Sequence, residues 1–212
     1  MEFQILKPFG PTILRAKIPD DLVKNLNEYI DKIIEDKNKK DELNYGNKLA
    51  GDVTQEFKLE KDFAKKIGWL DFLAKCTQTW IKNSMNKKIT KFNLIESWVV
   101  RQFENEYNPT HWHNGHISGA GFLKVPKELG KFYQGKEKEE KHYPGGNLNL
   151  IHGSRMFLCD SSLLIKPTVG DFYFFPHYLM HTVYPFKDTK EERRSISFNA
   201  FIDEEVFNVY KH

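Results

Sequence analysis

The fold is decided by an aromatic stretch near the C-terminus, PTVGDFYFFP at residues 167–176, and by the histidine that follows it at position 181. Gly170 gives a turn signal before the aromatic run, and Pro176 ends it, as expected for a strand bounded by turns. A shorter strand pattern follows at 182–184 and stops at Pro185. The stretch therefore predicts two consecutive strands with His181 between them.

Two further histidines, His111 and His113, lie about 70 residues earlier and flank Trp112. In an extended strand, side chains two positions apart point to the same face of the sheet. The two imidazoles would then converge on one point, which is half of a metal site. We expect His181 to supply the distant part of that site, while Trp112 points the other way and packs.

Hydrophobic residues recur with a period close to two from about residue 91 to residue 202, after two helix-like patterns at 19–34 and 61–85. This order predicts an α+β protein, mainly β, with a double-stranded β-helix (a jelly roll, cupin-like) and N-terminal helices packed on one sheet. Short rim strands are expected in 3–17, a mobile loop in 35–47 and an exposed excursion in 126–145. The expected strands are 92–103, 111–113, 119–125, 148–151, 162–165, 171–175, 182–184 and 195–202.

Length and composition narrow the class of protein. The 212 residues suit one domain over 1–212, with supporting strands and helices in 1–90 and the jelly-roll core in 91–202. A formal net charge of +3 argues against a nucleic-acid partner. The two cysteines have no CxxC spacing, the N-terminus does not resemble a leader, and no apolar run is long enough to span a membrane. We therefore expect a soluble cytoplasmic protein.

From about Glu96 to Asn199 the sequence resembles the Fe(II)/2-oxoglutarate-dependent oxygenases, in particular small bacterial and phage members related to prolyl hydroxylases. The resemblance lies in the order and spacing of several short motifs. They are Glu96-Ser97-Trp98, His111-x-His113, Ser118-Gly119 before Phe122-Leu123, Gly170-Asp171 and Phe175-Pro176 before His181, and Arg193-x-Ser195 before Asn199.

The resemblance implies an Fe(II) site, 2-oxoglutarate as cosubstrate and O2 as oxidant, with ascorbate as an optional reductant. It assigns the metal-binding and catalytic positions to His111, His113 and His181. Such a site leaves three coordination positions for 2-oxoglutarate and O2. The family's usual signature is His-x-Asp or His-x-Glu, however, and this chain has a histidine at the carboxylate position.

Three interpretations of the third ligand remain open. His113 replaces the carboxylate and the site has three histidines. Alternatively, His113 is the first ligand and the carboxylate position stays empty, as in related halogenases that bind chloride there. The third interpretation takes a carboxylate from elsewhere in the chain, such as Asp160.

The cosubstrate anchor is expected on the strand that begins at Arg193. Bound 2-oxoglutarate leaves its second carboxylate deep in the barrel, and an arginine can meet a carboxylate with two parallel hydrogen bonds. Arg193 and Ser195 share one face of the predicted strand, and Arg194 lies on the other. By resemblance Arg193 is the 2-oxoglutarate arginine, with Trp98 or Gln102 on the neighbouring strand as a further contact.

The resulting hypothesis is a hydroxylase that couples decarboxylation of 2-oxoglutarate to oxidation of a C–H bond in a second substrate. A peptidyl or amino-acid substrate fits the resemblance, but the sequence indicates neither the substrate nor an oligomeric state. Two alternatives stay open: a cupin-like three-histidine metalloprotein without 2-oxoglutarate, and a non-catalytic jelly-roll module that binds through Tyr107, Phe132, Tyr133 and Tyr143.

Overall fold

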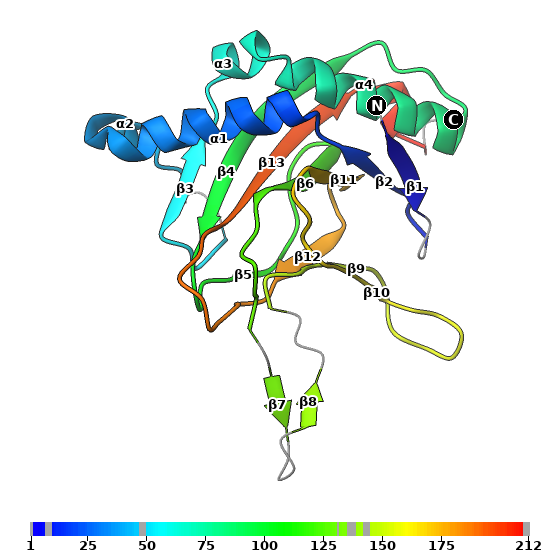
Figure 1. Ribbon diagram of the computed structural model, residues 1–212. Helices are drawn as coiled ribbons and strands as arrows, with labels where there is room; N and C mark the ends of the chain where they lie inside the picture. The colour runs from blue at the N-terminus through cyan, green and yellow to red at the C-terminus, as the bar shows by residue number, and fades with distance from the viewer. Residues whose placement is uncertain are drawn as a thin grey trace.

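The computed structural model describes residues 2–6, 10–46, 50–130, 132–134, 139–141 and 145–209. Two antiparallel sheets face each other, and helices cover the outer face of the larger one (Figure 1). This is the jelly roll that the strand pattern predicted, and every pairing between described strands is antiparallel.

The larger sheet has seven strands in the order β1-β2-β11-β6-β13-β4-β3. Their bounds are Phe3–Leu6 (β1), Ile13–Lys17 (β2), Gln55–Lys58 (β3), Phe92–Gln102 (β4), Ile117–Lys124 (β6), Asp171–Pro176 (β11) and Arg193–Ile202 (β13). The smaller sheet has the order β10-β9-β12-β5. It consists of Asn108–His111 (β5), Leu148–Ile151 (β9), Ser162–Ile165 (β10) and Met180–Val183 (β12).

The helices and a separate hairpin complete the described fold. The helices are Asp20–Glu35 (α1), Lys37–Glu42 (α2), Lys61–Lys66 (α3), Trp69–Met85 (α4) and Glu204–Phe207 (α5). Strands Phe132–Gln134 (β7) and Glu139–Lys141 (β8) pair within the predicted excursion and extend away from both sheets in Figure 1. No helix among the described residues is both long enough and apolar enough to cross a membrane.

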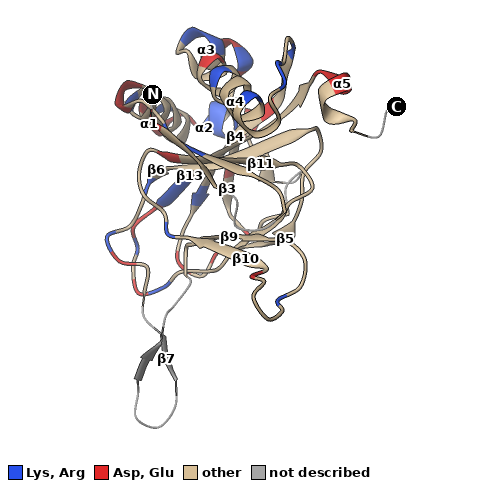
Figure 2. Ribbon diagram, turned by 90° about the vertical axis from the view of Figure 1, so that its right-hand side faces the viewer, with Lys and Arg blue, Asp and Glu red and all other residues tan. Residues whose placement is uncertain are grey.

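Two apolar clusters form the core on either side of the larger sheet. The first lies between that sheet and the helices, where Leu26 and Ile30 of α1 and Trp69 of α4 are fully buried. The second lies between the two sheets and includes Phe122 and Leu150. Charged residues are dense on the helices, whereas the strands of the smaller sheet contain none (Figure 2).

Strand β13 contributes to both regions because its side chains point alternately toward the helices and toward the smaller sheet. Ile196, Phe198 and Ala200 pack in the cluster under the helices. Arg193, Ser195 and Ser197 line a pocket between the sheets. One strand therefore carries both the packing of the helix layer and the polar residues of the interior.

Several local expectations were wrong. The segment 61–85 is two helices, because Gly68 adopts a positive φ of 84° that ends α3 and starts α4. Part of the predicted loop 35–47 is helix α2, whose N-terminus is capped by the Asp36 carboxylate through the amides of Asn38 and Lys39. Strand β3 was not predicted, and β2 is an inner strand between β1 and β11.

Candidate active site between the two sheets

The three predicted histidines lie together at one end of the smaller sheet. His111 is the last residue of β5, and its Cα is paired in register with that of His181 on β12. His113 lies two residues beyond the end of β5, so the predicted strand 111–113 ends earlier than expected. One nitrogen from each imidazole lies within 4.8 Å of the other two.

Backbone carbonyls fix the tautomers of two of these rings. His111 donates its Nδ1–H to the carbonyl of Pro109 at 2.7 Å, and His181 donates its Nδ1–H to the carbonyl of Leu179 at 2.9 Å. A carbonyl can only accept, so Nδ1 holds the proton in each neutral ring and Nε2 is left with a lone pair. Metal-binding histidines are commonly oriented through the opposite ring nitrogen in this way.

The surroundings keep the cluster uncharged. Burial and the neighbouring imidazoles lower the pKa of His113 to about 2, and burial and His111 lower the pKa of His181 to about 3. The pKa of His111 is also lowered, mainly by burial. Neutral imidazole is the form that binds metal ions.

The spacing of one pair of ring nitrogens, on His113 and His181, fits a shared ion. Nε2 of His113 and Nε2 of His181 are 2.9 Å apart. Two imidazole nitrogens bound at right angles to one ion, each at about 2.1 Å, would be roughly 3 Å apart. The donor set, three neutral nitrogens around one point, suits Fe(II) and other first-row divalent metals.

No carboxylate joins the three imidazoles in the described part of the chain. Asp160, which the sequence offered as one source, lies exposed in the loop between β9 and β10. Trp112 does not pack as expected, because it is 64% exposed. The sequence pattern placed it opposite the two histidines, but it lies beyond the end of β5.

The other two histidines nearby have separate roles. His177 donates its Nδ1–H to the carbonyl of His113, and the His113 amide donates to the carbonyl of His177. These two bonds hold the segment that carries His113. His116 is 8% exposed, rather than a surface residue, and stacks on Phe207 while its Nδ1 accepts from the Ile202 amide.

Arg193 lies on the inner face of β13 and is 1% exposed. Its Nε donates to the carbonyl of Gly146 at 2.8 Å, and its Nη1 donates to Gln102 at 3.2 Å and to Ser195 at 3.3 Å. The guanidinium also lies over the ring of Phe122 at 5.2 Å. All of these partners are neutral, and no carboxylate pairs with Arg193 among the described residues.

Burial without a compensating charge lowers the pKa of Arg193 to about 10. An isolated charge in the interior is costly, whereas a bound carboxylate would compensate it. The three histidines, Arg193 and Ser195 line the same pocket, together with Trp98 and Phe122. The predicted anchor and the predicted metal ligands therefore share one cavity.

Sequence reasoning identified some of these residues and missed others. Gln102 and Trp98 were the two residues considered as further contacts of the cosubstrate; Gln102 accepts a hydrogen bond from Arg193, and Trp98 lines the pocket. Phe122 and the Gly146 carbonyl were not foreseen as contacts of the guanidinium, since nothing in a single sequence marks a residue from another strand as its neighbour. Phe132, Tyr133 and Tyr143 of the binding-module alternative lie outside the residues whose side chains are described.

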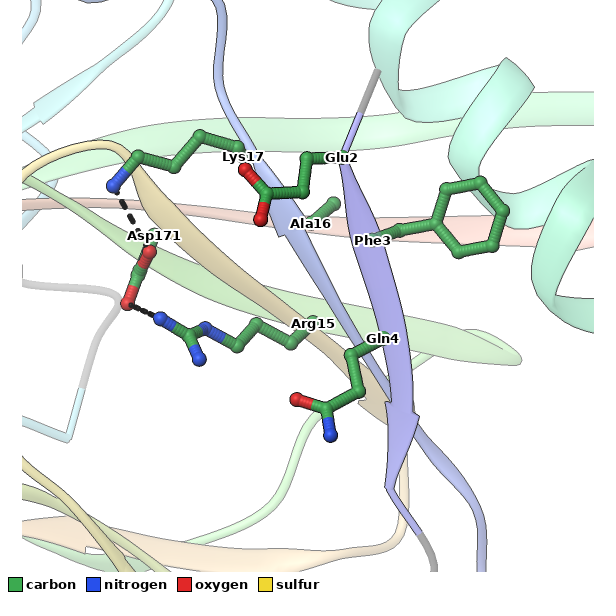
Figure 3. Close-up of a pocket in the computed structure, with 7 residues that line it drawn as sticks. All are labelled: Glu2, Phe3, Gln4, Arg15, Ala16, Lys17 and Asp171. Atoms are coloured by element: carbon green, nitrogen blue, oxygen red, sulfur yellow. Dashed lines mark hydrogen bonds and ion pairs between the residues drawn. The ribbon is translucent and has the colours of Figure 1, made fainter.

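A second hollow lies on the larger sheet at β1, β2 and β11, and Asp171 in it is paired with two cations (Figure 3). Asp171 accepts from Arg15 at 2.8 Å and from Lys17 at 3.1 Å. Both hydrogen bonds join β11 to β2. Asp171, part of the motif before His181, is thus a link between strands rather than a ligand-binding group.

Residues 96–199 match the family model described as "Putative 2OG-Fe(II) oxygenase". The chain belongs to the 2OG-Fe(II) oxygenase family. The matched residues contain the three histidines, Arg193 and Ser195 of this oxygenase. No curated protein matches the sequence significantly.

Solved structures share the fold of this oxygenase at low sequence identity. A prolyl 4-hydroxylase from Pseudomonas putida has 12% identity and a TM-score of 0.56, with 88% of this chain and 91% of that chain covered. The viral collagen prolyl hydroxylase of Paramecium bursaria Chlorella virus 1, solved with 2-oxoglutarate, has 17% identity and a TM-score of 0.53, covering 88% and 94%. A Trichoplax adhaerens prolyl hydroxylase has 13% identity and a TM-score of 0.54, covering 99% and 87%.

Proposed function

We propose that His111, His113 and His181 hold Fe(II), that Arg193 and Ser195 anchor 2-oxoglutarate, and that the enzyme hydroxylates a C–H bond of a second substrate. The observation that carries the proposal is Arg193, a fully buried cation without a carboxylate partner in the described chain, in the same pocket as three neutral imidazoles. A dicarboxylic acid that chelates the metal through one end would place its other carboxylate beside Arg193 and compensate the guanidinium charge.

Each residue has a definite task in this proposal. The Pro109 and Leu179 carbonyls keep the Nε2 lone pairs of His111 and His181 turned toward the ion. Gln102 and Ser195 accept hydrogen bonds from Arg193 and hold the guanidinium in place before the cosubstrate arrives. The apolar walls, such as Phe122 and Val183, exclude water from the reacting centre.

When bound, Fe(II) and 2-oxoglutarate supply O2 activation, with the cosubstrate converted to succinate and CO2. Among the three ligand arrangements, the geometry supports the three-histidine site, because His113 approaches His181 while no carboxylate of the described residues joins the cluster. Ascorbate is proposed as a reductant that maintains Fe(II), and the cytoplasm as the location, in keeping with the two free cysteines.

Oxygen uptake and succinate release test this function directly. Fe(II)-loaded protein should consume O2 with 2-oxoglutarate and show little uptake without it. In an Arg193→Ala variant, adding 2-oxoglutarate should no longer stimulate O2 uptake. Uptake that is indifferent both to 2-oxoglutarate and to the variant would favour a cupin-like three-histidine enzyme. Absence of stoichiometric metal after anaerobic loading, with no change in Tm on adding Fe(II) and 2-oxoglutarate, would favour a binding module.

A further inference from the structure

A second pocket adjoins the histidines on the side of β3 and β4. His111 and His113 form part of its wall, together with two carboxylates, Glu56 and Glu96, and two indole rings, Trp98 and Trp112. Its remaining polar lining consists of asparagine side chains, and no lysine or arginine of the described chain lines it. The pocket is therefore acidic and reaches the proposed metal ligands.

Glu56 is the unusual member of this pocket. It lies on β3 opposite Val100 of β4 and is only 1% exposed. Neither of its carboxylate oxygens has a hydrogen-bond partner in the part of the chain that the structure describes. The backbone packs closely over it, since a Cβ on Gly51 would stand 3.2 Å from Oε1.

Glu96 is held in place from two sides. It accepts hydrogen bonds from the Tyr45 hydroxyl and from Nδ2 of Asn199, at 3.1 Å for the amide. Asn199 is fixed in turn, because its Oδ1 accepts from the Ser118 hydroxyl at 2.8 Å. The second carboxylate thus has a fixed position without being neutralised by a cation.

A buried carboxylate without a partner is costly, and a cation that donates hydrogen bonds removes most of that cost. Burial and the charge of Glu106 raise the pKa of Glu56 to about 7, which reflects the same lack of compensation. The faces of Trp98 and Trp112 would add cation–π attraction. A neutral or anionic group would leave both carboxylates uncompensated.

We infer that this pocket receives a cationic group, an ammonium or a guanidinium, of the substrate that is oxidised at the adjoining histidine site. The oxidation of this substrate rests on the proposed function, and its positive charge is inferred from Glu56 and Glu96. It narrows the substrate to compounds with a basic nitrogen, which Glu56 would bind while the neighbouring C–H bond faces the three histidines.

Isothermal titration calorimetry with two charge-matched probe pairs tests the inference. The full chain is loaded with Mn(II) and 2-oxoglutarate without O2. It is then titrated with Nα-acetyl-lysine amide or its neutral Nε-acetylated form, and with Nα-acetyl-arginine amide or its neutral citrulline counterpart. At least one charged probe should bind about tenfold or more tightly than its neutral partner, in line with a charge-assisted hydrogen bond.

A Glu56→Gln variant should lose that preference without a fall in Tm, because the change removes an uncompensated buried charge but little volume. Glu205→Gln, which removes an exposed carboxylate on α5, is the matched control and should behave like the wild type. Equal binding of charged and neutral probes, no binding of any probe, or a preference that survives in Glu56→Gln would overturn the inference.

The same titrations separate this inference from the proposed function. If Mn(II) and 2-oxoglutarate bind but the charged probes show no preference, the oxygenase assignment stands and the cation pocket is wrong. If the charged probes are preferred through Glu56 while Mn(II) and 2-oxoglutarate do not bind, the cation pocket is supported and the proposed oxidation at the histidines is wrong.

Discussion

Arg193 and Arg194 are consecutive residues of β13, both fully buried, and they have opposite surroundings. Arg194 faces the helix layer and donates to the carboxylates of Glu192 and Asp31, each at 2.6 Å. Arg193 faces the space between the sheets and meets only neutral groups. A paired buried cation links one layer to another, whereas an unpaired buried cation in a pocket is the basis on which we propose an anion-binding site.

The same difference separates two glutamates, the partly buried Glu192 and the buried Glu56. Burial opposes ionisation of Glu192, but hydrogen bonds from Arg101 and Arg194 lower its pKa. Glu56 has no such partner, and burial raises its pKa to about 7. The unpaired charges Arg193 and Glu56 therefore lie in pockets that the histidines line, whereas Arg194 and Glu192 are paired with each other and with groups on α1 and β4.

The largest expected effect is on the metal. His181→Ala removes one of the three nitrogens, so the affinity for Mn(II) should fall by at least about 100-fold, since the loss of outer partners alone costs 10- to 100-fold. Equilibrium dialysis measures this, with His152→Ala as the control because His152 is exposed in the loop after β9. Equal metal binding by the His181→Ala variant would place the metal elsewhere.

Paired substitutions of the two arginines sharpen the contrast between them. Arg193→Met should weaken 2-oxoglutarate binding to the Mn(II)-loaded protein by about 10- to 100-fold, the range of charge-assisted hydrogen bonds. It should leave the free energy of unfolding unchanged or raised, since it removes an uncompensated buried charge. Calorimetry and urea unfolding measure the two quantities.

Arg194→Met should give the reverse result. The free energy of unfolding should fall by about 2 kcal/mol, because Asp31 and Glu192 lose a buried partner while Glu192 keeps Arg101. The affinity for 2-oxoglutarate should change little. If both variants lost cosubstrate affinity to the same degree, the two faces of β13 would not be functionally distinct.

The stability of the metal-free protein should depend on pH through Glu56. Its pKa is about 7 in the folded chain and about 4.3 in the unfolded chain, so between these values only the folded chain holds the proton. The free energy of unfolding therefore falls as pH rises through this window. Relative to Glu56→Gln, the wild type should lose about 2 kcal/mol between pH 5 and pH 8 in urea titrations.

If the difference in free energy of unfolding between wild type and Glu56→Gln stayed constant across that pH range, this account of Glu56 would be contradicted. This result would mean that the carboxylate is already compensated in the folded protein. The Glu205→Gln variant again serves as the control, because its carboxylate is exposed in both states.

The smallest expected effect concerns Ser195, which accepts from Arg193 at 3.3 Å. Ser195→Ala should weaken 2-oxoglutarate binding by about 3- to 10-fold, as for one neutral hydrogen bond. Ser197→Ala, on the same strand face and in the same pocket, is the matched control and should have a weaker effect. A loss as large as that of Arg193→Met would make Ser195 the main anchor.

The sequence predicted the jelly roll from alternation along single strands, whereas the convergence of the three histidines was expected from the family resemblance and depends on the pairing of β5 with β12. The strands at 148–151 and 162–165 match the structure at both ends. Alternation also distinguished Arg193 from Arg194, since residues one apart on a strand face opposite layers. The strand pattern and the two faces of β13 are local features, so a single sequence predicts them.

The errors concern features that depend on distant parts of the chain. Glu56 looks like any surface glutamate in a polar segment, and only the pairing of β3 with β4 buries it. Trp112 is exposed because β5 ends at His111. A pattern as short as His-x-His does not define where a strand ends. Helix α2 forms in a highly charged segment because Asp36 caps it.

The most direct test of the central claim is a crystal structure of the protein with Mn(II) and 2-oxoglutarate, grown without O2. The ion should lie within about 2.2 Å of a nitrogen from each of His111, His113 and His181. The far carboxylate of 2-oxoglutarate should meet Arg193 and Ser195. An ion bound without one of these histidines, or a cosubstrate whose far carboxylate leaves Arg193 unpaired, would contradict the account.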